Sequence, residues 1–280
     1  MSASITNRPS PQKVVLITGA SSGIGQACAE HLARSGWRVF GTGRGAPPAV
    51  QAGAAFEMVT MDVDDENSVR QGVESVLAKA GRLDAVVNNA GIAIMGAVED
   101  TSIEEAKAQL ETNFFGVLRV CRATLPALRK QGGGHVVNIS SLAGIIGLPF
   151  SGLYSASKFA LEGVSESLRM ECRAFGIHVV LVEPGDFRTN ITTRRRIAAA
   201  AETNDAYREA FEHCKQKQEQ DETNAPGPEA VARLVGRILS NPHPRTRYSV
   251  GLLSQRMVVP LKRFLPQRLF EWAARQAFGM

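Results

Sequence analysis

The sequence predicts an α/β fold: a doubly wound parallel sheet of about seven strands with helices on both faces. Short β-branched apolar runs alternate with longer segments of helical periodicity, and such strand–helix–strand units favour parallel crossovers. The runs are apolar at nearly every position, as in sheets buried on both faces. With 280 residues, 44% of them hydrophobic and 21% charged, the chain has a globular composition, which excludes disorder.

The predicted elements run the length of the chain. We expect strands at residues 13–18, 37–42, 55–61, 84–88, 135–140, 177–183 and 247–250. We expect helices at residues 23–35, 66–80, 102–130, 154–175 and 228–240. Glycine stops such as Gly36 and Gly132 support these boundaries. No linker divides the chain, so we expect a single domain over residues 1–280, with its core at about 13–190 and 228–251.

Charge and cysteine usage limit the possible functions. The net charge is +5, but residues 252–280 contribute +4 of it through five basic residues and one acidic residue. The body is therefore nearly neutral, which argues against nucleic-acid binding. The cysteines form no CxxC and the histidines no HExxH, so we expect no metal. The polar amino-terminal segment lacks the apolar core of a signal peptide, so we expect a cytoplasmic protein.

A glycine-rich turn joins the first predicted strand to the first helix. Its glycines permit close backbone approach, and the helix that follows offers free N–H groups to a phosphate. The spacing is GxxxGxG, which differs from the GxGxxG fingerprint and from a Walker loop. A glycine turn without a ligand is the alternative interpretation. The candidate phosphate-binding residues are Gly19, Ser21, Ser22, Gly23, Ile24 and Gly25.

The end of the second strand bears on the choice of cofactor. In dinucleotide folds an acid here binds the ribose 2′-hydroxyl, whereas an arginine accommodates a 2′-phosphate. This chain has Arg44 and no carboxylate, and a guanidinium suits phosphate. We therefore expect NADP(H) over NAD(H), although Arg44 could also be a solvated loop residue. The glycines of Gly41–Gly45 precede Pro47-Pro48 rather than a helix, so we expect a loop there.

Tyr154 and Lys158 stand four residues apart on a predicted helix and therefore share a face. A nearby ammonium stabilises tyrosinate, so we expect Lys158 to lower the pKa of Tyr154 and prepare it for acid–base chemistry. Chance could also produce this pair. Ser155 to Lys158 also match the SxxK pattern of penicillin-binding enzymes. The sequence contains neither of the tripeptides that accompany this pattern, so we do not favour that interpretation.

Taken together, the motifs resemble the short-chain dehydrogenase/reductase family over residues 13–190. In chain order they are Thr18-Gly19-xxx-Gly23-x-Gly25, Asp62-Val63, Asn88-Asn89-Ala90-Gly91, Asn113, Ser140-Ser141, Tyr154-xxx-Lys158 and Pro184-Gly185-xxx-Thr189. Each motif alone has a plain structural explanation, such as a polar turn or a surface amide. The ordered set is far more specific, and it implies a Rossmann-like enzyme.

The resemblance implies a role for each matching position. Tyr154 would be the general acid or base, Ser141 would orient the substrate oxygen, and Asn113 would hold a relay water. Lys158 would lower the pKa of Tyr154 and bind the nicotinamide ribose. The other implied cofactor contacts are Asp62 and Val63 at the adenine, Asn89, Ala90 and Gly91 along the cofactor, and Pro184, Gly185 and Thr189 beside the nicotinamide.

Residues 147–163 resemble the 17β-hydroxysteroid and retinol dehydrogenase branch. That branch implies an apolar carbonyl or alcohol substrate, such as a steroid, a retinoid or a fatty ketone, and a specificity lid at residues 186–225. Four apolar side chains either line the substrate pocket or pack around the active-site loop: Leu142, Leu148, Phe150 and Leu153.

The tail at residues 252–280 is amphipathic and basic. We expect the tail to pack on the substrate cleft or in a subunit interface. Contact with a membrane surface is the less favoured alternative, because Pro260 and Pro266 interrupt the helix. The resemblance also implies a homo-oligomer, a dimer or tetramer. The sequence thus predicts an NADP(H)-dependent oxidoreductase acting on a small apolar molecule. The alternative is a regulatory protein that binds NADP(H) without catalysis.

Overall fold

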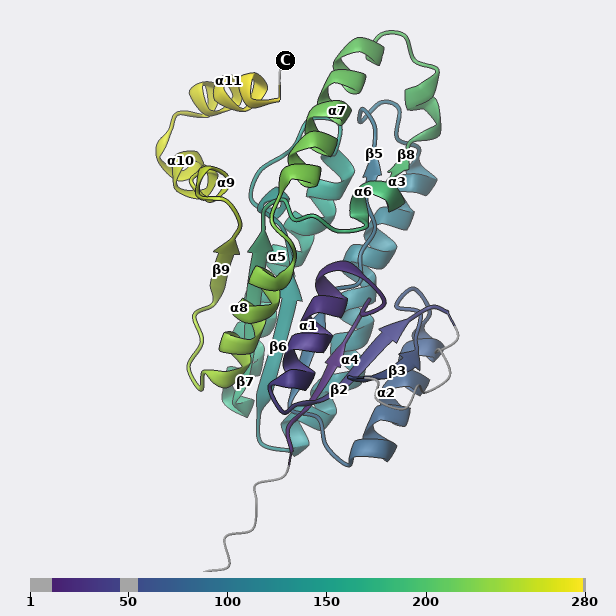
Figure 1. Ribbon diagram of the computed structural model, residues 1–280, viewed down its shortest axis with the longest axis vertical. Helices are drawn as coiled ribbons and strands as arrows, with labels where there is room; N and C mark the ends of the chain where they lie inside the picture. Colours follow the sequence, from purple (N-terminus) through teal and green to yellow (C-terminus); the bar gives the residue numbers. More distant parts are fainter. Residues whose placement is uncertain (1–11, 46–54, 279–280) are drawn as a thin grey trace, which may run out of the picture.

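The computed structural model describes residues 12–45 and 55–278. The polar amino-terminal segment and the Pro47-Pro48 pair, both used in the sequence predictions, lie outside the described residues apart from Gln12. Figure 1 shows a central sheet between two layers of helices, with the carboxyl-terminal helices to one side.

The sheet has seven parallel strands in the order β3-β2-β1-β4-β6-β7-β9. From β1 the chain adds β2 and β3 on one side, and then crosses to add β4 and the later strands on the other side. Ligands bind at this kind of switch point, beyond the carboxyl ends of the strands. The doubly wound prediction is confirmed. The strands are β1 (Val14–Ile17), β2 (Arg38–Gly43), β3 (Glu57–Thr60), β4 (Ala85–Asn88), β6 (Gly134–Ile139), β7 (Ile177–Pro184) and β9 (Arg247–Val250).

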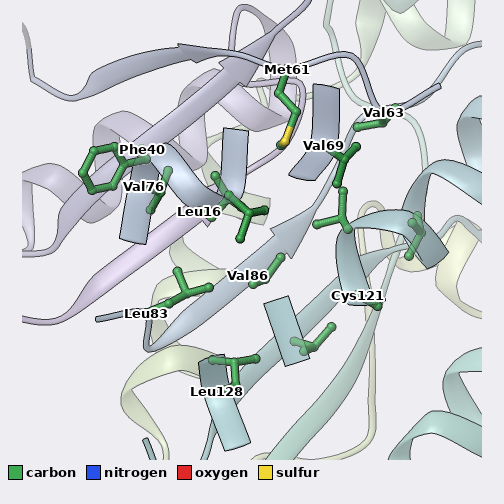
Figure 2. Close-up of a cluster of buried hydrophobic side chains, with 14 of the residues drawn as sticks. Leu16, Phe40, Met61, Val63, Val69, Val76, Leu83, Val86, Cys121 and Leu128 are labelled. Carbon is green, nitrogen blue, oxygen red and sulfur yellow. The ribbon is translucent and has the colours of Figure 1, made fainter. Parts of the chain in front are cut away.

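Two hydrophobic clusters fix the helices to the two faces of the sheet. On one face, α1 (Gly23–Arg34) and α8 (Glu229–Ser240) bury apolar side chains against the strands. On the other face lie α2 (Glu66–Ala80), α4 (Gly116–Lys130) and α5 (Gly152–Cys172). Figure 2 shows part of the second cluster, where Leu16 and Val86 of the sheet face Val69 of α2 and Cys121 of α4. All four cysteines are buried and free.

Local signals set the helix boundaries. Asp65 caps α2 by accepting a hydrogen bond from the Ser68 amide at 2.6 Å, and Gly81 ends the helix in the left-handed region. The helix expected at residues 102–130 begins with a capping box at Ser102. It then divides into α3 (Ile103–Leu110), a π turn (Glu111–Phe115) and α4. Such π turns are frequent at functional sites, and this one contains Asn113.

One expectation about local structure was wrong in part, and one small element was not predicted. The Gly41–Gly45 segment is not wholly a loop, because Gly41 to Gly43 belong to β2. Glycine is required there by close packing, since a Cβ on Gly41 would lie 2.7 Å from the Cβ of Ala20. The structure also contains a second, two-stranded sheet, β5 (Ile94–Met95) with β8 (Arg196–Ile197). Two-residue strands are too short to show periodicity in the sequence.

The segment at 186–225 lies above the carboxyl ends of the strands and contains α6 (Ile191–Arg194), β8 and α7 (Arg208–Asn224). It has its own apolar cluster, in which the Phe150 and Phe211 rings meet edge to face at 5.6 Å. The tail forms α9 (Leu253–Arg256), α10 (Val258–Phe264) and α11 (Gln267–Ala277), which lie beyond the carboxyl end of β9, to one side of α7 in Figure 1. Over the residues described, every helix falls short of the length and apolarity that a bilayer crossing needs.

Candidate active site

A cavity of about 760 Å³ opens at the carboxyl ends of the strands. It extends from the glycine-rich turn, past the ends of β2 and β4, to α5 and the lid segment. All but two of the predicted site residues line it: Gly19, Ser21, Ser22, Gly23, Ile24, Arg44, Asp62, Val63, Asn89, Ala90, Gly91, Ser141, Tyr154, Lys158, Pro184, Gly185 and Thr189. The exceptions are Gly25 and Asn113, which lie behind the wall.

The glycine-rich turn forms a cradle for a phosphate. Gly19 and Gly23 have φ values of +66° and +57°, which favour glycine. A Cβ on Gly25 would lie 2.3 Å from the Gly19 carbonyl oxygen, so only glycine fits there. The first turn of α1 carries no acidic residue, and Ser22 at its N-cap makes no side-chain cap bond. The N–H groups of this turn are therefore available to an anion.

Asn89 connects the ends of two neighbouring strands. Its amide donates hydrogen bonds to the carbonyl oxygens of Thr18 at 2.9 Å and Gly19 at 3.2 Å. The Thr18 hydroxyl in turn accepts from the backbone N–H groups of Asn89 at 2.9 Å and Ala90 at 3.0 Å. These four bonds hold the glycine-rich turn against the segment after β4. Asn89 therefore braces the carboxyl ends of β1 and β4 against each other, and it also lines the cavity.

The opposite end of the cavity combines one arginine with two acids. Arg44 is exposed at the end of β2 and lines the cavity. Asp62 and Asp64 line it after β3, and Asp64 accepts a hydrogen bond from the Thr112 hydroxyl at 2.9 Å. Burial raises the pKa of Asp64, whereas Thr112 and Arg44 oppose that rise. Sequence reasoning missed Asp64 and Thr112, which are 48 residues apart along the chain.

Ser141, Tyr154 and Lys158 converge at the other end of the cavity. Tyr154 and Lys158 lie one turn apart on α5, and the Lys158 Nζ is 5.8 Å from the centre of the Tyr154 ring. Lys158 is only 5% exposed and donates a hydrogen bond to the Ile139 carbonyl oxygen at 3.0 Å. Ser141 follows β6, and its hydroxyl accepts from the Ala143 amide at 3.1 Å. A substrate oxygen at this wall would lie near the hydroxyl groups of Ser141 and Tyr154.

The predicted direction of the Tyr154 pKa shift was wrong. Burial raises the pKa of Tyr154 above its ordinary value, and the nearby carboxylates Glu222 and Asp186 raise it further. Ser141 and Arg195 act in the opposite direction. Burial also lowers the pKa of Lys158 to about 8, which still leaves this residue mostly protonated at pH 7. Desolvation outweighs the expected ammonium effect because both side chains lie against the protein interior.

The side chain of Asn113 is hydrogen-bonded within the protein. Its amide donates to the Ile92 carbonyl oxygen and to the Ser157 hydroxyl, each at 3.0 Å. Its oxygen accepts from the Ile92 amide at 2.8 Å. A relay water at this position would therefore have only the second lone pair of the Asn113 side-chain oxygen or the backbone of Asn113 to bind. The role of Asn113 stays a prediction.

The apolar residues expected near the substrate divide into two groups. Leu148 lines the cavity. Leu142 and Phe150 are buried in packing around the loop, whereas Leu153 is partly exposed; none of these three lines the cavity. Phe150 has an unusual φ of +53°, and its carbonyl accepts from the Gly96 amide at 2.8 Å. Further apolar wall comes from Ile92–Met95 and Ile191.

The segment at residues 186–225 contributes charged groups that sequence reasoning did not assign to the site. Arg195 forms an ion pair with Glu222 of α7, and their side chains are only 4% and 6% exposed. Asp186 lies nearby, and burial raises its pKa to about 6, with further contributions from Glu222 and Asp221. All three side chains line the cavity. Nothing in the sequence indicated the Arg195–Glu222 pair, because pairing across 27 residues leaves no local signal.

Comparisons with known proteins agree with this geometry. A family model described as short chain dehydrogenase matches residues 13–200. The 3-ketodihydrosphingosine reductase of Bacteroides thetaiotaomicron is 41% identical over 263 residues, covering 94% of this chain and 97% of that protein. A crystal structure of a short-chain dehydrogenase from Streptomyces avermitilis has a TM-score of 0.80 at 35% identity, covering 93% of this chain and 97% of that one.

A further solved structure contains a cofactor. It is a short chain dehydrogenase/reductase from Burkholderia phymatum in complex with NAD, with a TM-score of 0.76 at 25% identity. The match covers 90% of this chain and 93% of that one.

The fold and the site define a dinucleotide-binding α/β oxidoreductase. More specifically, the chain belongs to the short-chain dehydrogenase family. It is an enzyme that acts on CH–OH or C=O groups and uses a nicotinamide cofactor. The resemblance found in the sequence is thereby confirmed at the level of the family.

Proposed function

We propose that the enzyme transfers a hydride between NADP(H) and an apolar carbonyl or secondary alcohol, with Tyr154 as the acid or base. One observation carries this proposal: Ser141, Tyr154 and Lys158 line the same cavity as the glycine-rich turn. A catalytic acid and a cofactor cradle in one cavity are what carbonyl reduction requires. A regulatory protein that binds NADP(H) without catalysis has no need of the intact trio.

The residues divide the chemistry between them. When bound, the nicotinamide supplies or accepts the hydride. The raised pKa of Tyr154 keeps its phenol protonated at neutral pH, in the form that can donate a proton to a carbonyl oxygen. Ser141 would orient that oxygen, and Lys158 would hold the nicotinamide ribose. Pro184, Gly185 and Thr189 would flank the nicotinamide, whereas Asp62 and Val63 would contact the adenine.

Arg44 supports the choice of NADP(H). It is exposed at the cavity edge, beyond the end of β2, where a 2′-phosphate would be placed. A Cβ on the neighbouring Gly43 would lie 3.7 Å from the Cβ of Ser21. The end of β2 thus lies beside the glycine-rich turn, which brings Arg44 close to the phosphate cradle. A planar guanidinium favours phosphate there.

Among steroid, retinoid and fatty-ketone substrates, we favour a fatty ketone. A relative covered over almost its whole length is named as a 3-ketodihydrosphingosine reductase, and the wall here includes Leu148, Ile191 and Ile92–Met95. Residues 186–225 would act as the substrate lid within a single domain. The four free cysteines suit a reducing cytoplasm. Assembly into a dimer or tetramer stays a prediction.

Replacement of Tyr154 by phenylalanine tests the mechanism. We expect Tyr154→Phe to lower kcat for NADPH-dependent reduction of a long-chain ketone by about 10²- to 10⁴-fold, the usual contribution of a positioned general acid. Affinity for NADPH, measured by fluorescence titration, should change little.

Tyr207→Phe is the matched control, because the Tyr207 hydroxyl bonds to Glu99 and the residue does not line the cavity. Full activity in Tyr154→Phe would refute the mechanism. Tight NADPH binding by wild-type protein, with no turnover of any carbonyl in a broad panel, would support the regulatory alternative.

A further inference from the structure

The tail exposes apolar side chains that folding leaves uncovered. Of fourteen large hydrophobic residues exposed in the described part of the chain, seven lie between residues 252 and 272. Leu253 is 70% exposed, Phe264 79% and Trp272 60%. No residue of α9, α10 or α11 is buried. Such a concentration of apolar surface indicates an interaction site.

These side chains form an ordered stripe. Helices α9 and α10 are separated only by Met257, whose backbone is itself helical, with φ −65° and ψ −17°. The spacing of Leu253, Met257, Leu261 and Phe264 therefore places them on one face of a nearly continuous helix. Pro260 falls in the first turn of α10, where its missing N–H costs no helical bond. The tail is interrupted at Pro266, between α10 and α11, as the sequence predicts, whereas Pro260 lies within α10 and leaves the α9–α10 stripe in place.

The opposite face of the tail is fixed to the active-site loops. Gln255 accepts a hydrogen bond from the Asp186 amide at 3.1 Å and donates one to the Asp186 carboxylate at 2.5 Å. Lys262 donates to the Ile145 carbonyl oxygen and lies over the ring of Phe159, 5.0 Å from its centre. Residues 252–278 do not line the cavity. The tail therefore lies beside the cavity and does not cover it.

Arginines accompany the exposed stripe. By helical spacing, Arg256 and Arg263 lie along one edge of the α9–α10 stripe. On α11, Arg268 and Arg275 lie one turn before and one turn after Trp272, on the same outward side. The tail contains one acidic residue, Glu271. Its outward surface is consequently apolar and cationic together.

We propose that this outward surface of α9–α11 docks on an anionic phospholipid membrane. Interfacial helices bury an apolar face among the headgroups while arginines contact anionic lipid, and tryptophan favours the boundary. A second copy of the chain fits this surface less well, because two-fold pairing would bring two cationic patches together. Because the tail also contacts Asp186 and Ile145 beside the cavity, docking of the tail would place the cavity next to the membrane.

The two tryptophans of the chain provide the assay. Trp37→Phe leaves Trp272 as the sole indole. We expect its emission to shift to the blue when phosphatidylglycerol vesicles are added, and not with pure phosphatidylcholine. In flotation assays the wild-type protein should bind the anionic vesicles, and salt should weaken that binding. Because no substrate is present, failure here would leave the proposed catalytic function untouched.

Variants separate the apolar and cationic contributions. The double variant Phe264→Ala, Trp272→Ala should abolish flotation. Removal of a single tail arginine should weaken vesicle binding about fivefold, equivalent to ~1 kcal/mol per basic residue. The single variants are Arg256→Gln, Arg263→Gln, Arg268→Gln and Arg275→Gln. Met170→Ala, which removes a 73% exposed residue of α5, is the matched control and should bind as wild type.

Two results would overturn the proposal. One is the absence of wild-type binding to phosphatidylglycerol vesicles. The other is a wild-type dimer in light scattering that becomes monomeric in the Phe264→Ala, Trp272→Ala variant, because the tail surface would then be a subunit interface. Unchanged reduction of a short, water-soluble ketone by these variants would show that they fold.

Discussion

The buried ion pair between Arg195 and Glu222 yields a prediction about both the lid and Tyr154. Glu222 also accepts hydrogen bonds from the Thr192 hydroxyl at 2.5 Å and from the Gln218 amide at 3.3 Å. The Nη1 atom of Arg195 is buried and has no hydrogen-bond partner. Glu222→Gln keeps the shape and an acceptor for Thr192 but leaves the guanidinium without its carboxylate.

The size of the effect follows from burial. Both side chains are less than one-tenth exposed, and removal of one partner from a buried ion pair costs about 3–5 kcal/mol. Arg195→Met leaves Glu222 with the hydrogen bonds from Thr192 and Gln218, so we expect a smaller loss. The double variant buries no charge and should regain most of the stability lost by Glu222→Gln.

The same variants should move the pH profile in opposite directions. Glu222 raises the pKa of Tyr154, and Arg195 lowers it. Reduction requires protonated Tyr154, so activity should fall as the pH rises through this pKa. Glu222→Gln should bring that fall to lower pH, and Arg195→Met should move it to higher pH.

Urea unfolding measures the change in stability, and proteolysis within α7 measures how firmly this helix is held. The pH dependence of kcat/KM measures the shift in the pKa of Tyr154. The reasoning is refuted if the two single variants shift the alkaline limb in the same direction. It is also refuted if Glu222→Gln neither destabilises the protein nor increases cleavage of α7, because the pair would then not hold the lid.

Three further predictions concern the cofactor end and the lid. Arg44→Asp should reduce the preference for NADPH over NADH by roughly 10- to 100-fold, since a charged hydrogen bond contributes ~1.5–3 kcal/mol; an unchanged ratio of kcat/KM values would contradict this. Gly25→Ala should destabilise the protein by about 1–3 kcal/mol and weaken NADPH binding in titration calorimetry, whereas Gly147→Ala, with nothing within 4 Å of its Cβ, should do neither. Asp186 has a folded-state pKa of about 6, raised from 3.8 by burial, so its ionisation opposes folding increasingly between about pH 4 and pH 6 and to the full extent above pH 6. Asp186→Asn should therefore increase the free energy of unfolding at pH 8 by about 1–3 kcal/mol, and the gain should vanish as the pH falls toward 4; a gain independent of pH would contradict it.

Most of the fold was predictable because its signals are local. Strands buried on both faces are continuous apolar runs, and the helix from Glu66 to Ala80 was predicted with its observed bounds, between the Asp65 cap and Gly81. Exceptions arose where packing overrides local preference. Gly43 extends β2 one residue beyond the predicted end of the strand, and the π turn around Asn113 interrupts a segment of ordinary helical pattern.

The candidate site shows the same division. The glycine-rich turn, Tyr154 and Lys158 could be found in the sequence, because each depends on spacing within one turn or one helix. Asp64, Asp186 and the Arg195–Glu222 pair could not, because contacts between residues far apart in the chain bring them to the cavity.

The sequence by itself determined the parallel α/β fold, the family and the candidate residues for cofactor binding, since these are recorded in periodicity and motif order. Only the tertiary structure decided the direction of the Tyr154 pKa shift, because that depends on how completely folding removes water from the side chain. Tertiary structure likewise decided which face of the basic tail remains exposed, because Gln255 and Lys262 fix the opposite face to the body.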